Sequence, residues 1–335
     1  MNSETIKASL LEDGEEWREA RSKLRHVEGA LAHFDLSEAD FSNRDLADLD
    51  FSKADFFHAR FEQANLKKGV FHSADFTSSC MTGADLYKAD LQNAVLQETD
   101  LSGAELSYTN CQGADFRGAN LTGARLNEAD LRGADFSHAD LTDVDLTRAN
   151  ITGAKFHFAR FTDANVMHLN YGTYLDMDGL YYGVRGIDST FGNAIFVRDA
   201  KDQDYIDTLQ HAILDSTPGF SRNLRLFLFK AWKLIDHGRS LSKVAFYAFL
   251  IATFYGFIYL LDMKLGWEIM DYSNSAKTWF TPFYYSVVTY TTLGFGDVTA
   301  DSLFGEIFVI SEVILGYFTL GLLLAILANT IARRS

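Results

Sequence analysis

A five-residue period runs through the first half of the chain without interruption. Every fifth residue from Leu31 to Val166 is Leu, Phe, Ile, Val, Met or Cys, which makes 28 consecutive positions. Ala dominates the position two residues before each of these, and Asp or Asn is frequent between the two. A period of five fits neither the helical repeat of about 3.6 nor the strand repeat of about 2 residues, so the backbone must turn a corner in every unit. One unit buries little apolar surface, so successive coils must stack into a solenoid.

The repeated pattern A-(D/N)-(L/F)-x-x, as in Ala114-Asp115-Phe116, closely resembles the pentapeptide-repeat family. That resemblance implies a right-handed, four-sided parallel β-helix with four repeats per coil, here over residues 31–171. An open solenoid end exposes apolar surface and unpaired backbone, so we expect covers at both ends. Residues 1–30 are predicted to form an N-terminal cap helix. Residues 172–217, where the period breaks, are predicted to form a C-terminal cap and linker, either as a degenerate final coil or as a cover.

The charge of the chain is concentrated in this half. The formal charge is −15, and residues 1–200 hold 33 of the 45 acidic side chains but 19 of the 30 basic ones. Binding of nucleic acid needs Lys and Arg against the phosphates, so we expect no nucleic-acid partner. We interpret the acidic rows as solvated corners of the rod and favour this over mimicry of DNA, which some relatives show. A protein or ligand of unknown identity could dock on one of the four faces.

Two apolar segments in the second half are long enough to span a membrane. They cover residues 244–261 and 307–328, and a third, too short to span, covers residues 279–290. The short segment is typical of a re-entrant pore helix, whose ends must be surrounded by protein or water. The alternative is that these segments are buried core helices of a soluble domain. Together they predict an all-α membrane domain over residues 241–335, so the fold class of the whole chain is mixed.

Basic residues indicate the orientation of this domain in the inner membrane of the cell. The segment before the first span and the C-terminus are rich in Lys and Arg, whereas the loop between the spans is mostly acidic. The positive-inside rule therefore predicts a multi-pass protein whose N- and C-termini are both cytoplasmic. Residues 218–240 combine basic side chains on one arc with apolar ones on the other, which predicts an interfacial helix on the anionic lipid surface.

A heptad follows the predicted pore helix. It reads Thr291, Thr292, Leu293, Gly294, Phe295, Gly296 and Asp297. Backbone carbonyls that point to one axis can replace the water around a cation, and alternate Gly residues permit the left-handed backbone that this needs. The heptad resembles the potassium-channel signature T-V-G-Y-G-D, and residues 240–334 resemble the two-helix potassium channel pore.

That resemblance implies the sites for K⁺. The carbonyls of Thr292, Leu293, Gly294 and Phe295 and the Thr292 hydroxyl would hold the ion, and Gly296 and Asp297 would shape the outer mouth. Phe295 cannot donate the hydroxyl hydrogen bond that Tyr offers at this place, which weakens the support of the filter. Four subunits must surround one pore, so a C4 homotetramer is expected.

The second span contains the candidate gate. Gly316 aligns with the hinge glycine of the family's inner helix, and the alternative is a glycine that serves close helix packing. Leu320, Leu324 and Ala328 follow at intervals of four residues. We expect them to line the cavity and the gate, where an apolar ring can close by dewetting.

Glu312 is an ionisable residue inside the same span, which makes it a functional candidate. Many relatives place an acid in the pore helix behind the filter, where this chain has Val288. Our hypothesis is that Glu312 braces the filter from behind, with Thr289 or Tyr290 as its partner. The alternative is a glutamate that is passively hydrogen-bonded.

The sequence therefore predicts a K⁺-selective channel subunit that carries a cytoplasmic β-helix as a regulatory or assembly module. The alternatives are a non-selective cation channel and a membrane-tethered binding protein whose pore is vestigial. No dinucleotide fingerprint or phosphate-binding loop is apparent, so we expect neither enzymatic activity nor a cofactor, and K⁺ enters only as the permeant ion.

Overall fold

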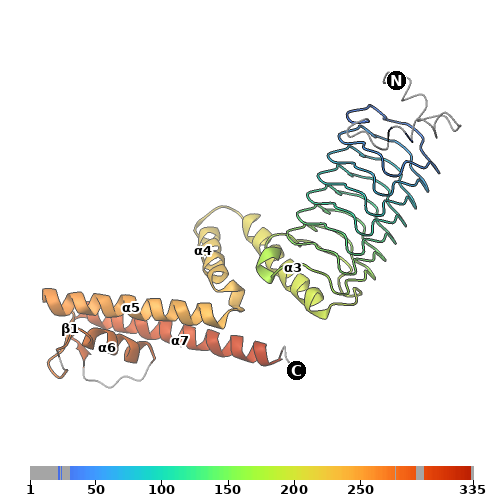
Figure 1. Ribbon diagram of the computed structural model, residues 1–335. Coiled ribbons are helices and arrows are strands. Elements are labelled where there is room, and N and C mark those ends of the chain that lie inside the picture. Colours follow the sequence, from blue (N-terminus) through green and yellow to red (C-terminus); the bar gives the residue numbers. More distant parts are fainter. Residues whose placement is uncertain (1–21, 23, 25–30, 276, 292–297, 333–335) are drawn as a thin grey trace. The chain divides into compact units, whose positions relative to one another are not determined.

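The computed structural model describes residues 22, 24, 31–275, 277–291 and 298–332 (Figure 1). It divides into two compact units, with the boundary between Asp215 and Ser216. The predicted cap helix of residues 1–30 falls almost entirely on residues outside this description, and so do the filter residues 292–297.

One five-residue unit makes one side of each coil in the first unit. Phe51 points inward, two turn residues follow, Ala54 also points inward, and Asp55 pairs with the next coil. Parallel bridges join each such residue to the one 20 positions later, so four units make a coil. The N–H of Phe56 donates to the carbonyl of Asp75 at 2.7 Å, and this bond between coils recurs along the rod. The predicted β-helix is confirmed for the described residues.

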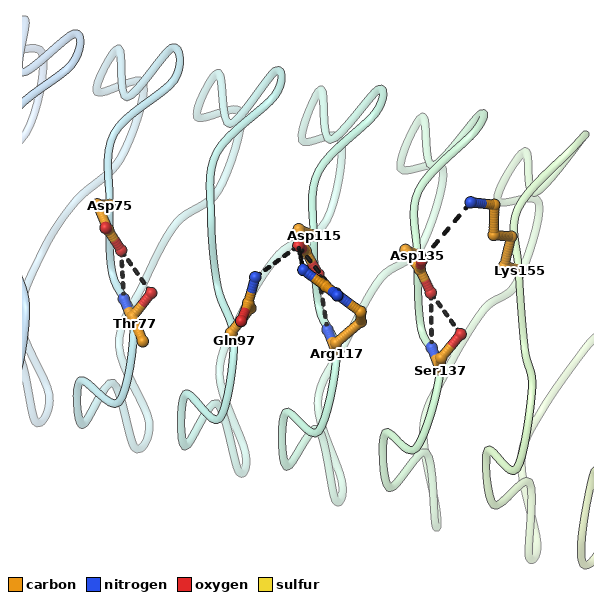
Figure 2. Close-up of polar contacts among 8 residues, drawn as sticks. All are labelled: Asp75, Thr77, Gln97, Asp115, Arg117, Asp135, Ser137 and Lys155. Atoms are coloured by element: carbon orange, nitrogen blue, oxygen red, sulfur yellow. Dashed lines mark hydrogen bonds and ion pairs between the residues drawn. The ribbon is translucent and has the colours of Figure 1, made fainter.

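Asp and Asn side chains at the corners are part of the turns (Figure 2). The Oδ1 atom of Asp75 accepts the main-chain N–H of Thr77 at 2.9 Å and the Thr77 hydroxyl at 2.6 Å. Asp115 likewise accepts the N–H of Arg117 at 3.1 Å, and it is linked to the preceding coil by Gln97 Nε2 at 2.8 Å. Asx turns of this kind stabilise a tight corner. The acidity of the rod therefore follows from its turn chemistry as well as from solubility.

Stacked side chains fill the interior of the rod. The rings of Phe116 and Phe136 lie 4.7 Å apart and nearly parallel, and Phe136 and Phe156 continue the stack at 5.3 Å. Cys111 lies in the same interior, where desolvation raises the pKa of its thiol to about 12. The thiol is therefore protonated and packs as a small apolar group.

The β-helix continues beyond residue 171. Two longer bridges, Arg160↔Arg185 and Asn165↔Phe191, form a final irregular coil, which the short 3₁₀ helix η1 (Tyr174–Met177) lengthens. The period breaks because the extra residues of this coil belong to η1 and its flanking turns.

Helix α3 (Ala194–Leu214) covers the end of the final coil (Figure 1). The carboxylate of Asp207 accepts the N–H of Tyr181 at 3.1 Å, and that of Asp204 accepts the N–H of Gly183 at 2.7 Å. In the preceding coils, equivalent N–H groups donate to carbonyls of the next coil. Residues 172–217 thus contain both a degenerate coil and a cover, and the cover is helix α3.

Three helices make up the C-terminal part of the second unit (Figure 1). They are α5 (Leu241–Leu265), α6 (Thr281–Tyr290) and α7 (Leu303–Ala332), and β1 (Met270–Asp271) pairs antiparallel with β2 (Thr299–Ala300). Helices α5 and α7 are long and apolar enough to cross a membrane. Only 28% and 17% of their most apolar windows are buried, which argues against core helices of a soluble domain.

Helix α4 (Phe220–Leu234) occupies most of the predicted interfacial segment, but it does not extend to residue 240. A 3₁₀ turn, η2 (Asp236–Gly238), follows, in which His237 adopts a left-handed conformation with φ of 53°. Asp236 is also left-handed, with φ of 52°, so the chain cannot continue α4 through this turn. Helix α5 begins shortly afterwards with Ser240 as its N-cap. The predicted single helix over 218–240 is therefore two elements.

Candidate ion-conduction site

Helix α6 lies between α5 and α7, and two glycines permit its close approach. A Cβ atom at Gly256 of α5 would lie 3.0 Å from the Cα of Phe283, and one at Gly316 of α7 would overlap the carbonyl oxygen of Tyr290. Contacts this short leave no room for a side chain. Gly316 therefore serves close packing against α6, and its role as a hinge stays a prediction. Gly256 is a counterpart on α5 that the sequence did not single out.

The C-terminal end of α6 is fixed by hydroxyl groups. Tyr290 Oη lies 2.6 Å from Thr319 Oγ1 of α7, and Thr319 donates to the carbonyl of Leu315 at 2.7 Å. Thr291, the first residue after α6, donates its hydroxyl to the carbonyl of Val287 at 2.7 Å. The end of α6 is thereby set immediately before residues 292–297, of which the structure describes nothing.

Glu312 is completely buried and contacts both other helices of the domain. It accepts a hydrogen bond from Tyr259 Oη of α5 at 2.8 Å, and its Oε1 is hydrogen-bonded to Ser286 Oγ of α6. The predicted partners Thr289 and Tyr290 are wrong, since the two carboxyl oxygens of Glu312 bond to Tyr259 and Ser286, and Tyr290 pairs with Thr319. Thr289 and Val288 are buried residues of α6.

The expected pore-lining row turns around the helix. Gly316 is buried against α6, whereas Leu320, Leu324 and Ala328 are exposed in the single chain. Residues four apart differ by about 40° around an α-helix, so a row at this spacing moves away from the face on which it starts. Leu320 lines one hollow together with Gly316, Tyr290 and Thr291. Leu324 and Ala328 are turned farther around the helix, so the row does not keep a single face along its whole length.

Asp262, near the C-terminal end of α5, shapes the other end of the domain. It is 2% exposed, and its carboxylate accepts the N–H groups of Ile269 at 3.0 Å and Met270 at 3.1 Å. Tyr272 donates its hydroxyl to the carbonyl of Tyr259 at 3.0 Å. An acid at the C-terminal end of an apolar span, where it opposes the helix dipole, was the signal available in the sequence.

Ser286 and Tyr259 are also residues that sequence reasoning missed. Ser286 is a polar residue in the apolar run Phe283–Val288, where a hydroxyl needs a partner. That isolated hydroxyl was the available signal, but its partner depends on how α6 packs against α5 and α7.

Comparison with known proteins assigns families to both units. A model described as pentapeptide repeats, with eight copies, matches residues 35–72, 54–93, 84–123, 94–133 and 129–166. A model described as ion channel matches residues 244–333. No curated protein matches the chain.

Solved pentapeptide-repeat proteins also match. HetL, involved in heterocyst differentiation regulation in the cyanobacterium Nostoc sp. strain PCC 7120, is 23% identical, with 53% of this chain and 93% of HetL covered and a TM-score of 0.34. Another pentapeptide repeat protein from Nostoc PCC 7120 is 33% identical, with 32% of this chain and 83% of that chain covered and a TM-score of 0.26. On the two family models, the chain joins a pentapeptide-repeat domain to a C-terminal ion channel domain, and neither family is enzymatic.

Proposed function

We propose that the chain is one subunit of a tetrameric, K⁺-selective channel in the inner membrane of the cell. The observation that carries the proposal is the position of α6, which is held between α5 and α7 and ends directly before the heptad Thr291–Asp297. This is the order of elements that a re-entrant pore helix and its filter require. The match of residues 244–333 to an ion channel model supports the same conclusion.

Conduction in this proposal depends on main-chain oxygens. The carbonyls of Thr292, Leu293, Gly294 and Phe295 and the Thr292 hydroxyl replace the hydration shell of K⁺, as the resemblance to potassium channels implies. The C-terminal end of α6 contributes the partial negative charge of a helix dipole next to the ion. One chain supplies one filter segment, so rings of oxygens need several copies, and fourfold symmetry is the closed arrangement that we propose.

The proposed orientation places both termini in the cytoplasm. It is supported by the basic residues of α4 and by the acidic loop between α5 and α7. A cysteine introduced at Ser273, in that loop, should react with a membrane-impermeant thiol reagent added outside intact cells. Labelling only after the cells are opened would contradict this orientation.

Reconstitution into liposomes with K⁺ and Na⁺ on opposite sides tests the function. We expect a reversal potential close to the K⁺ equilibrium value, and Gly294→Ala should abolish the current by disturbing the filter backbone. A reversal potential near zero would favour the non-selective cation channel. A folded tetramer without current would favour the membrane-tethered binding protein with a vestigial pore.

We further propose that the pentapeptide-repeat domain acts as a regulatory or assembly module, with an unidentified protein or ligand as its partner. The boundary between compact units at Asp215 supports a separable module. Deletion of residues 1–215 distinguishes the two roles. An assembly module predicts loss of the tetramer in detergent, whereas a regulatory module predicts an intact tetramer with altered open probability.

A further inference from the structure

Ser286 makes two hydrogen bonds that its single hydrogen cannot both supply. The residue is completely buried, and its Oγ lies 2.7 Å from the carbonyl oxygen of Ala252 and is also bonded to Oε1 of Glu312. A serine hydroxyl donates one hydrogen and accepts others, and a main-chain carbonyl can only accept. The hydrogen of Ser286 is therefore committed to Ala252, and the bond to Glu312 needs a hydrogen from elsewhere.

In two other networks of the same domain, the middle hydroxyl likewise donates one hydrogen and accepts another. In each, a Ser or Thr of α7 donates to a carbonyl of its own helix and accepts the hydrogen of a tyrosine. In the first, the hydroxyls of Tyr255 and Ser311 lie 2.7 Å apart, and Ser311 donates to the carbonyl of Phe308 at 2.8 Å. In the second, the hydroxyls of Tyr290 and Thr319 lie 2.6 Å apart, and Thr319 donates to the carbonyl of Leu315 at 2.7 Å. Ser286 stands in the place of the middle hydroxyl, and Glu312 stands in the place of the tyrosine. By analogy the donor to Ser286 must be Glu312.

We infer that Glu312 carries a proton and donates it to Ser286 Oγ. The hydrogen bonds then run in one direction: Tyr259 donates to Oε2 of Glu312 at 2.8 Å, Glu312 donates to Ser286, and Ser286 donates to the carbonyl of Ala252. Every polar atom of this network has a partner. A neutral acid also avoids an uncompensated charge at a fully buried position, because the described partners of Glu312 are hydroxyls and include no cation.

This arrangement makes Glu312 a positioning residue. It joins α7 to α5 through Tyr259 and to α6 through Ser286, which lies five residues before Thr291. The carboxyl thereby holds the helix that precedes the proposed filter. Its effect on conduction rests on the proposed channel function, whereas its protonation can be measured without any current.

Infrared spectra of the full-length, reconstituted protein at neutral pH test the protonation. The difference between wild type and Glu312→Gln should contain the C=O stretching band of a protonated carboxyl group. Ser286→Ala should shift that band, because the acid loses its acceptor. Ser311→Ala, which breaks the matched network that lacks a carboxyl group, should leave the band in place. If the difference spectrum between wild type and Glu312→Gln contains carboxylate bands instead, the inference is overturned.

Conduction gives the second readout. The side chain of Glu312→Gln can donate an N–H to Ser286 and accept from Tyr259, so its current should stay within about twofold of wild type. Glu312→Leu can do neither and should lose about tenfold or more. A current as low for Gln as for Leu would refute the donor role. If Glu312→Leu fails to assemble, the infrared spectrum of Ser286→Ala tests the donor role. A shifted carboxyl band supports that role, and an unchanged band refutes it. Absence of current in the wild type would refute the channel function alone, because the infrared band still reports the proton.

Discussion

The two units of this chain are stabilised in opposite ways. In the β-helix the same inter-coil hydrogen bonds, Asx turns and stacked rings recur at regular intervals, so each contact has many equivalents. In the channel domain the decisive contacts occur once each, at Gly256, Gly316, Asp262 and Glu312. A repeat spreads its stability over many small contributions, whereas the channel domain concentrates it. Substitutions should therefore have small effects in the rod and large ones around α6.

The largest effect is expected for Gly316→Ala. The added methyl group would overlap the carbonyl oxygen of Tyr290, so α6 and α7 must separate, at a cost of about 1–3 kcal/mol in the free energy of unfolding. We expect loss of most of the K⁺ current in liposomes and a lower melting temperature.

Gly321→Ala is the matched control on the same helix, because a Cβ atom there meets nothing within 4 Å. It should leave both measurements unchanged or raise the stability slightly, since Ala favours a helix over Gly. If Gly316→Ala altered gating but left the melting temperature unchanged, Gly316 would be a hinge and its packing role would be refuted.

The end of the rod should be more sensitive than its middle. Asp207→Ala removes the acceptor for N–H groups of the final coil, which have no further coil to bond, and should cost about 1–3 kcal/mol in chemical unfolding. Asp130→Ala removes one corner among many and should cost about 1 kcal/mol or less. Equal losses for the two variants would mean that α3 does not limit the stability of the rod.

The sequence predicted the rod well because every unit meets the same constraint. A large inward residue, a small inward residue and a corner are visible in each repeat, so one atypical residue does not hide the pattern. Helix α3 escaped prediction because its buried face includes Asp199, Gln203 and Asp207. Asp199 and Asp207 accept hydrogen bonds from groups of the last coil, and Gln203 donates to Asp207. Their polarity erases the apolar periodicity by which a helix is recognised.

In the channel domain the sequence predicted elements better than contacts. Glu312 stood out as an acid in an apolar span, and its burial agrees with that choice. The hydrogen-bond partners of Glu312 could not be predicted from the sequence. The side of α6 that faces Glu312 is set by the close approach of α6 to Gly256 of α5 and Gly316 of α7. Such packing depends on three helices at once, which local periodicity does not encode. The filter assignment stays a prediction from sequence.

Acid should weaken the corners of the rod. Hydrogen bonds from the Arg60 guanidinium and the Ser42 hydroxyl lower the pKa of Glu62 to about 2, and the bond from Arg132 lowers that of Asp130. A carboxyl whose pKa is lowered by folding stabilises the fold above its ordinary value of about 4. That contribution is lost as the pH falls from there through the folded pKa. The free energy of unfolding should thus decline below about pH 4.

Glu62→Gln isolates one of these corners. The variant should be less stable than wild type by about 1 kcal/mol at neutral pH, and the difference should vanish near pH 2. A difference that is the same at both pH values would show that the ion pair with Arg60 contributes nothing through its charge.

The smallest effects concern the left-handed residue of each corner. Lys53 has φ of 58°, a conformation that costs a side chain about 1 kcal/mol, and Lys53→Gly recovers this but loses part of it to the greater freedom of the unfolded chain. The expected gain is about 0.5 kcal/mol in chemical unfolding. Gly123 has φ of 67°, and a Cβ atom there would meet nothing within 4 Å. Gly123→Ala should therefore lose about 0.5 kcal/mol, because the smaller freedom of the unfolded chain offsets part of the strain. Because the two corners share no partner, the double variant should equal the sum of the single ones. A departure from that sum would mean that the coils of the rod are coupled more strongly than a repeat with local contacts allows.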